Sequence, residues 1–328
     1  MSELSPPSKR RGRLLRFGAA LVVMCAVAGY LVVQYVTGGA GPGCKVVSGR
    51  TDGATYEFSP EQAVNAATIA AVGTGRGMPE RAVTIALATA LQESALRNIG
   101  YGDRDSLGLF QQRPSQGWGT PKEILDPTYS ANSFYKHLAK VPDYTKLPLT
   151  VAAQKVQRSG FPTAYAKHEP DAALLAAALT GQSAATLTCA GRPAATQAAG
   201  ADAVRTALVR DFGQDVLKSA SAEVGAEATP TPTPSASGSG SGRTVTLPVT
   251  AETGSGSGSG SDRSLRQRGW QLAHWAVANA SALHIERVSY AGRQWTAGNT
   301  DSQWRAAGAE GAAGAEQDAG AVRIVTAQ

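Results

Sequence analysis

Residues 90–112 read ALQESALRNIGYGDRDSLGLFQQ, and this stretch contains the most informative carboxyl group of the chain. Glu93 is the only acidic residue between Arg81 and Asp103. It lies near the end of an apolar run, residues 79–96, which starts with proline and has no internal glycine or proline. Apolar residues recur along this run at helical spacing. The pattern predicts a buried helix over residues 79–96 with a carboxyl group in its last turn.

Two features of this position favour the protonated form of Glu93. A helix C-terminus carries partial negative charge, and apolar surroundings penalise a charged side chain, so both raise the pKa of a carboxyl group. A glutamate with a raised pKa can act as a general acid near neutral pH. The alternative is an ordinary ion pair with Arg97, which lies four residues further on in the favourable orientation for a helix.

The residues around Glu93 resemble a known superfamily. Glu-Ser at the helix end, a short polar loop and SLGLFQ at residues 106–111 are similar to soluble lytic transglycosylases and goose-type lysozymes, which carry Glu-Ser and then Ser…Gly-Leu-Met-Gln. The continuation, QQRPSQGWGT and later DPTYSANSFYKHL, resembles lysozyme-like domains of actinobacterial cell-wall proteins. The resemblance covers about residues 55–180. Phe110 replaces the family's Met, and TAYAK at residues 163–167 stands nearest to its Ala-Tyr-Asn-Xaa-Gly motif.

The resemblance implies that Glu93 is the catalytic acid/base for the sugar backbone of peptidoglycan, with Ser94 supporting its orientation. The Gly-Leu-Phe-Gln strip would line the glycan cleft. For Trp118, stacking on a sugar face and anchoring the core are equally consistent with the sequence. The predicted substrate-binding residues are Ser94, Ser106, Gly108, Leu109, Phe110, Gln111, Trp118 and Tyr165.

The implied reaction begins with Glu93 protonating the glycosidic oxygen. In a transglycosylase the sugar's own 6-hydroxyl then attacks and leaves an anhydro end, whereas in a hydrolase water attacks. Glycosidases commonly use a second carboxylate, and Asp103 and Asp105 are the nearby candidates, although both also suit a solvated turn. The absence of a compelling partner acid favours the transglycosylase. The alternative function is a non-catalytic peptidoglycan-binding or assembly protein, which the departure from the Ala-Tyr-Asn motif favours.

The N-terminus combines basic residues with an uncharged run. Most of the formal net charge of +6 lies in residues 1–16, so no broad basic face indicates a nucleic-acid partner. Residues 17–36, FGAALVVMCAVAGYLVVQYV, are uncharged and long enough to span a bilayer. The sequence therefore predicts a single-pass anchor in the cell membrane with the C-terminal bulk outside. A cleaved signal peptide is the alternative, but no small-Xaa-small site follows Val36.

The chain has three cysteines, of which Cys25 lies within the predicted span. Cys44 and Cys189 bracket the lysozyme-like region and would face an oxidising compartment in the predicted topology. We therefore expect a disulfide bond between them. Two free thiols are the alternative.

The predicted fold class is mainly α, because no alternating β pattern of any length occurs before residue 190. Ser59, Pro60 and Gln62 form a compact helix start. Within the predicted linker, residues 221–262, the segment RTVTLPVT at residues 243–250 is expected to form a transient strand. The predicted segments are a cytoplasmic basic tail (1–16), a transmembrane anchor (17–36), a stalk (37–58), the lysozyme-like helical domain (59–190), an amphipathic helix (200–220), a disordered Thr-Pro and Gly-Ser linker (221–262), a small α/β module (263–305) and a low-complexity tail (306–328).

The C-terminal module is predicted to contain a helix and then a β-hairpin, residues 287–290 and 294–296. Its aromatic residues Trp275, Tyr290 and Trp295 fit either a glycan platform or, as the small size of the module favours, a core. A protein of the cell-wall or secretion machinery is the partner considered for this module.

Other chemistries are disfavoured by the residue pattern. The four histidines show no metal-ligand spacing and are not clustered with cysteines, so we expect no metal and no cofactor. No Gly-Xaa-Ser-Xaa-Gly motif of a serine hydrolase occurs. The expected binding partners are peptidoglycan strands and, through residues 17–36, the cytoplasmic membrane.

Overall fold

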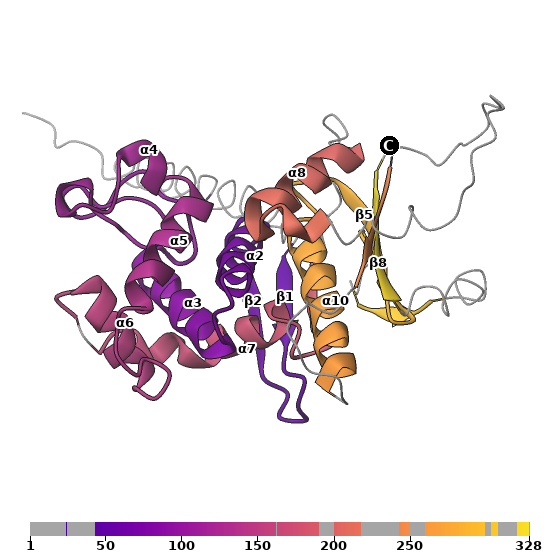
Figure 1. Ribbon diagram of the computed structural model, residues 1–328, viewed down its shortest axis with the longest axis horizontal. Coiled ribbons are helices and arrows are strands. Elements are labelled where there is room, and N and C mark those ends of the chain that lie inside the picture. The colour runs from indigo at the N-terminus through magenta and orange to yellow at the C-terminus, as the bar shows by residue number, and fades with distance from the viewer. Residues whose placement is uncertain are drawn as a thin grey trace, which may run out of the picture. The chain divides into compact units, whose positions relative to one another are not determined.

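The computed structural model describes Met24 and residues 43–161, 163–189, 200–217, 243–249, 260–298, 303–307 and 320–327. By its contacts the chain divides into two units, Met1–Gly41 and Pro42–Gln328. Every helix and strand whose bounds the structure gives lies in the second unit (Figure 1). The predicted basic tail and most of the predicted linker fall outside the described residues.

The predicted membrane anchor is corrected by the structure. Within the described ranges, no helix is both long enough and apolar enough to cross a bilayer. Residues 17–36 themselves lie outside the described residues, except for Met24. The prediction of a single-pass protein in the cell membrane relied only on the length and missing charge of that run, and the structure does not support it.

The helices begin largely where the sequence predicts. Ser59 caps α2 by accepting a hydrogen bond from the Gln62 backbone N–H, and the Gln62 side chain accepts one from the Ser59 N–H, so this predicted helix start is confirmed. The helices are α2 (Pro60–Gly75), α3 (Glu80–Ser94), α4 (Pro121–Ile124), α5 (Pro127–Leu138), α6 (Leu149–Gln157), α7 (Glu169–Leu179), α8 (Gly200–Phe212) and α10 (Gly260–Ala278), with short 3₁₀ turns η1 (Pro114–Gln116) and η2 (Ala166–His168).

The mainly α fold class is wrong, because two antiparallel sheets accompany the helices. The first has the order β2-β1-β3 and the second β4-β8-β5-β6-β7. The strands of the first are too short to show a period-two pattern, and the third pairs from far along the chain, which is why the sequence did not reveal them. The strands are β1 (Cys44–Val47), β2 (Thr55–Phe58), β3 (Leu187–Cys189), β4 (Thr244–Pro248), β5 (Ile285–Tyr290), β6 (Arg293–Thr296), β7 (Arg305–Ala306) and β8 (Ala321–Thr326).

Three local predictions are confirmed. Cys44 and Cys189 form a disulfide bond and face each other across β1 and β3. The predicted hairpin is the antiparallel pair β5 and β6. The strand predicted within residues 243–250 is β4, and it pairs with β8, which lies in the predicted low-complexity tail.

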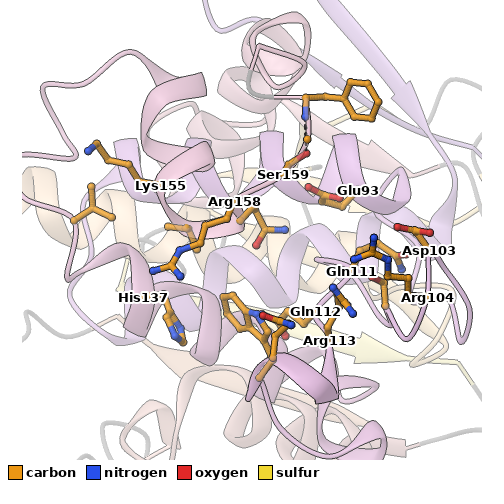
Figure 2. Close-up of a pocket in the computed structure, with 18 of the residues that line it drawn as sticks. Glu93, Asp103, Arg104, Gln111, Gln112, Arg113, His137, Lys155, Arg158 and Ser159 are labelled. Carbon is orange, nitrogen blue, oxygen red and sulfur yellow. Dashed lines mark hydrogen bonds between the residues drawn. The ribbon is translucent and has the colours of Figure 1, made fainter.

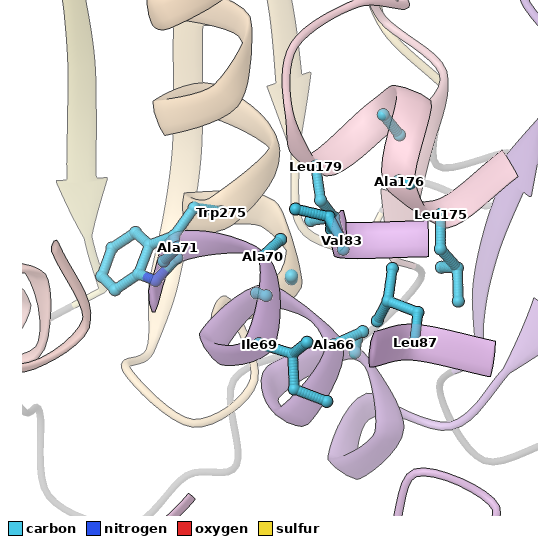
Figure 3. Close-up of a cluster of buried hydrophobic side chains, with 14 of the residues drawn as sticks. Ala66, Ile69, Ala70, Ala71, Val83, Leu87, Leu175, Ala176, Leu179 and Trp275 are labelled. Atoms are coloured by element: carbon cyan, nitrogen blue, oxygen red, sulfur yellow. The ribbon is translucent and has the colours of Figure 1, made fainter. Parts of the chain in front are cut away.

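Helix α2 is buried along most of its length and contacts α3, α5, α7, α8 and α10. Its contact residues are mostly small, and Figure 3 shows Ala66, Ala70 and Ala71 beside larger side chains from its neighbours. At Gly73 a Cβ atom would lie 2.6 Å from the ring of Tyr135, so this position requires glycine for packing. Small residues thus let several helices approach one central helix.

Helix α10 joins the five-stranded sheet to the rest of the unit. It contacts β5 and β8 on one side and α2, α7 and β3 on the other (Figure 1). His274 is fully buried, donates from Nδ1 to the Ala178 carbonyl (2.8 Å) and accepts from the Thr186 N–H (3.2 Å). Burial lowers the pKa of His274 to about 4, so the ring is neutral at neutral pH.

The aromatic residues Trp275, Tyr290 and Trp295 are almost completely buried, which agrees with the core interpretation rather than the glycan platform. The Trp275 indole donates to the carboxylate of Asp211 on α8 (2.8 Å). Asp211 also accepts from Thr68 on α2 (3.2 Å) and from the neighbouring Arg210 (2.8 Å). One buried carboxylate thus links α8, α2 and α10.

Replacing this carboxylate should destabilise the fold. Asp211→Ala should lower the free energy of unfolding by about 3 kcal/mol, because buried donors on two helices lose their acceptor. Urea denaturation measures the effect. Asp202→Ala is the matched control on the same helix, since the Asp202 side chain is 97% exposed, and it should leave stability nearly unchanged. Equal losses in the two variants would contradict this role for Asp211.

Candidate active site

Glu93 lies in the last turn of α3, whose other side chains are largely buried. The helix ends directly after it, because Ala95 and Leu96 adopt left-handed φ values of 51° and 58°. Arg97 therefore does not continue the helix and is exposed, and the ion pairs of the described residues do not include one between Glu93 and Arg97. Because the helix ends before Arg97, the helical spacing that would pair Glu93 with Arg97 does not exist.

The carboxyl group of Glu93 is held by Tyr165. The Tyr165 hydroxyl donates to Glu93 Oε1 at 2.7 Å, and the tyrosine is fully buried. Burial raises the pKa of Glu93, while hydrogen bonds from Tyr165 and Gln157 act in the opposite direction without cancelling it. Burial and the adjacent carboxylate raise the pKa of Tyr165, so its hydroxyl keeps its proton. Glu93 thus combines a raised pKa with a fixed orientation.

The loop after Glu93 is fastened to α3 by Ser94. The Ser94 hydroxyl donates to the carbonyl groups of Ala90 (3.1 Å) and Leu109 (2.8 Å). Leu109 and Phe110 are fully buried, and the Phe110 ring stacks on Phe134 with centroids 4.6 Å apart. These two side chains therefore support the loop from within the core.

A cleft of about 920 Å³ opens beside Glu93 (Figure 2). Of the predicted substrate-binding residues, Ser106, Gln111 and Trp118 line it. Those that do not line it are Ser94, Gly108, Leu109, Phe110 and Tyr165. The cleft is lined mainly by polar and charged side chains, as expected for a ligand rich in hydroxyl and amide groups.

Trp118 contributes to both the cleft and the packing. It lines the cleft and is only partly buried, while its ring lies 4.3 Å from the ring of His137 on α5. Tyr129 donates to the Trp118 carbonyl at 3.3 Å and fixes the loop. The structure therefore gives Trp118 features of both roles that the sequence left open.

The two candidate partner acids have different positions. Asp105 is bound by Arg113 Nε (2.7 Å) and by the Ser115 backbone N–H (2.8 Å). Hydrogen bonds from the Ser115 hydroxyl, the Ser115 N–H and Arg113 hold the pKa of Asp105 well below its usual range, and this residue does not line the cleft. Asp103 does line the cleft, together with Glu93.

Sequence reasoning missed the wall formed by the end of α6. Gln157 lies beside Glu93 and donates to the Phe110 carbonyl at 2.7 Å, and Lys155 and Arg158 line the same cleft. The one sequence signal for this wall is the polar run QRSG at residues 157–160, which begins at the last residue of the helix. In the described part of the chain, no three His, Cys, Asp or Glu side chains are grouped to hold a metal ion.

Comparison with protein families gives a match for the C-terminal part of the chain. Residues 201–317 match the family model described as VldE, C-terminal domain. The matched range includes α8, β4, α10 and β5–β7 but not Glu93 or the cleft, and it covers less than half of the chain. No curated protein matches the chain. The comparisons therefore leave the chemistry of the cleft to be inferred from its residues.

The raised pKa of Glu93 should appear in the pH dependence of stability. Ionising this buried carboxyl disfavours the folded state, and the penalty grows as pH rises through the folded-state pKa. Glu93→Gln removes the penalty, so the variant should gain stability relative to the wild type between about pH 4 and about pH 8.

Urea midpoints of both proteins at the two pH values measure this gain. Glu57→Gln is the control, because the Glu57 side chain is 78% exposed, and it should show no comparable gain. A difference between Glu93→Gln and the wild type that stays constant with pH would contradict the assignment.

Proposed function

We propose that this protein cleaves the glycan strands of peptidoglycan with Glu93 as the general acid. The observation that carries the proposal is the Glu93 carboxyl group itself, which has a raised pKa because of burial, is oriented by Tyr165 and lies in the wall of a large cleft. Its resemblance in sequence to lytic transglycosylases and goose-type lysozymes supports the same assignment.

The geometry suits both halves of the reaction. Protonated Glu93 gives its proton to the glycosidic oxygen while the bond to the anomeric carbon breaks. The Tyr165 hydroxyl, 2.7 Å away, then stabilises the carboxylate that remains. That carboxylate can accept the proton of the attacking nucleophile, which is the sugar's 6-hydroxyl in a transglycosylase or water in a hydrolase. The reaction balances without a metal or cofactor.

Two glutamines of the cleft lining are held in place by backbone carbonyl groups. Gln112 donates from Nε2 to the Ser130 carbonyl (3.1 Å), and Gln157 donates to the Phe110 carbonyl (2.7 Å). These bonds orient both side-chain amides, and the Oε1 atom of each is buried without a hydrogen-bond partner among the described residues.

The engagement of Asp105 favours intramolecular attack, whereas Asp103 remains the candidate base of a hydrolytic mechanism. Asp105 is engaged by Arg113 and Ser115, so it is not available to activate water. Asp103 is the carboxylate beside Glu93 in the lining of the cleft, and it is the residue that a hydrolytic mechanism would require. The proposal therefore specifies anhydro-ended products, with Asp103 as the test of the hydrolytic alternative.

Product analysis tests the function. The full chain should release anhydro-ended fragments from purified peptidoglycan, detected by mass spectrometry, and Glu93→Gln should slow release by about 10²- to 10⁴-fold. Glu80→Gln is the matched control, because Glu80 lies on the same helix, also has a pKa raised by burial and does not line the cleft, so this variant should retain activity.

Other outcomes are informative. Reducing-end fragments would indicate hydrolysis and assign a role to Asp103. If the wild type co-sediments with peptidoglycan but releases no fragments, the proposed glycan-cleaving activity is contradicted and the non-catalytic binding alternative is supported.

A further inference from the structure

The cleft has more positive than negative charge. Its lining includes the acids Glu93 and Asp103. The basic residues of the lining are Arg104, Arg113, Lys140, Lys155 and Arg158. Arg113 is paired with Asp105, which lies outside the lining. The charges that a ligand could meet are therefore those of Arg104, Lys140, Lys155 and Arg158. Neutral sugars alone do not require such a surface.

Three of these cations belong to one side of the cleft. Lys155 lies in the last turn of α6, Arg158 caps the same helix and Lys140 follows α5, which contacts α6. In Figure 2, Lys155 and Arg158 lie across the view from Asp103. The three side chains are exposed, and among the described residues none of them forms an ion pair.

Arg158 occupies a position that local folding does not favour for an arginine. Its φ of 52° is left-handed, the conformation that glycine or asparagine adopts most readily at the end of a helix. An arginine there strains the backbone. Lys155, three residues earlier on the same helix, adds repulsion between like charges. An anion bound between the two side chains would relieve this repulsion.

We propose that Lys140, Lys155 and Arg158 form an anion subsite that binds carboxylate groups carried by the glycan. This inference rests on the proposed function and names the chemical group of the substrate that this side of the cleft recognises, a carboxylate. In peptidoglycan the carboxylate belongs either to the lactyl ether of the sugar itself or to the peptide attached to it. The shared chemistry is an oxyanion recognised by ammonium and guanidinium groups.

Equilibrium binding tests the subsite independently of cleavage. The full chain with Glu93→Gln is titrated with three soluble oligosaccharides of equal length: a neutral chito-oligosaccharide, a peptide-free peptidoglycan strand and a peptide-bearing strand. At low salt at least one carboxylated strand should bind about fivefold to tenfold more tightly than the neutral one, and the preference should shrink as salt screens the exposed charges.

Charge reversal identifies the residues. In the Glu93→Gln background, Lys155→Glu with Arg158→Glu should abolish the preference for carboxylated strands while leaving neutral binding within about twofold. Lys136→Glu is the control, because Lys136 is exposed on α5 and does not line the cleft, so it should preserve the preference. Urea midpoints confirm that each variant is folded.

The outcomes separate the subsite from the proposed function. Equal affinity for neutral and carboxylated strands, or a preference that survives the double charge reversal, overturns the subsite even if the wild type cleaves peptidoglycan. A preference that depends on Lys155 and Arg158 supports it even if no cleavage is found. Tighter binding of the peptide-free strand assigns the lactyl carboxylate, and tighter binding of the peptide-bearing strand alone assigns the peptide carboxylate.

Discussion

The packing around helix α2 is the constraint on which the rest of the described fold depends. A helix contacted by α3, α5, α7, α8 and α10 has no solvent-facing side over most of its length, so its side chains must be small or shaped to their neighbours. The alanines of α2 and Gly73 meet this requirement, and the neighbouring helices supply the larger apolar groups (Figure 3). The same close packing fixes α3, which carries Glu93, and α7, which follows the turn that begins at Tyr165. Glu93 and Tyr165 are the candidate catalytic pair.

The position of Glu93 follows from this arrangement. Helix α3 contacts α7 and the preceding turn η2, and Tyr165 stands at the start of that turn, so two segments distant in sequence place a hydroxyl at 2.7 Å from a carboxyl group. The core that buries Tyr165 also removes water from Glu93 and raises its pKa. The end of α6 is built differently: Gln157 hydrogen-bonds to Glu93, whereas Lys155 and Arg158 at the same end of the helix are exposed.

Local signals made part of this arrangement predictable. The buried helix that carries Glu93 and the capped start of α2 depend on residues close in sequence, and both are confirmed. The three-stranded sheet was missed because β3 reaches β1 only through the folded domain, and three or four residues give no clear alternation. The cationic wall was missed because Lys155 and Arg158 reach the cleft only through the packing of α6 on α3 and α5, which no local residue pattern specifies. The predicted membrane anchor was wrong, since no helix among the described residues is long enough and apolar enough to cross a bilayer.

The most direct test of the account is the pKa of Glu93, measured by NMR titration of the side-chain carboxyl carbon in the full chain with ¹³C-labelled glutamate and assigned with Glu93→Gln. The account predicts a midpoint above the ordinary glutamate value of 4.5, because burial outweighs the hydrogen bonds from Tyr165 and Gln157. It also predicts that Tyr165→Phe moves the midpoint higher still, because the carboxylate loses a donor. A midpoint at or below 4.5 would show that Glu93 is ionised under acidic conditions and would contradict its role as the general acid.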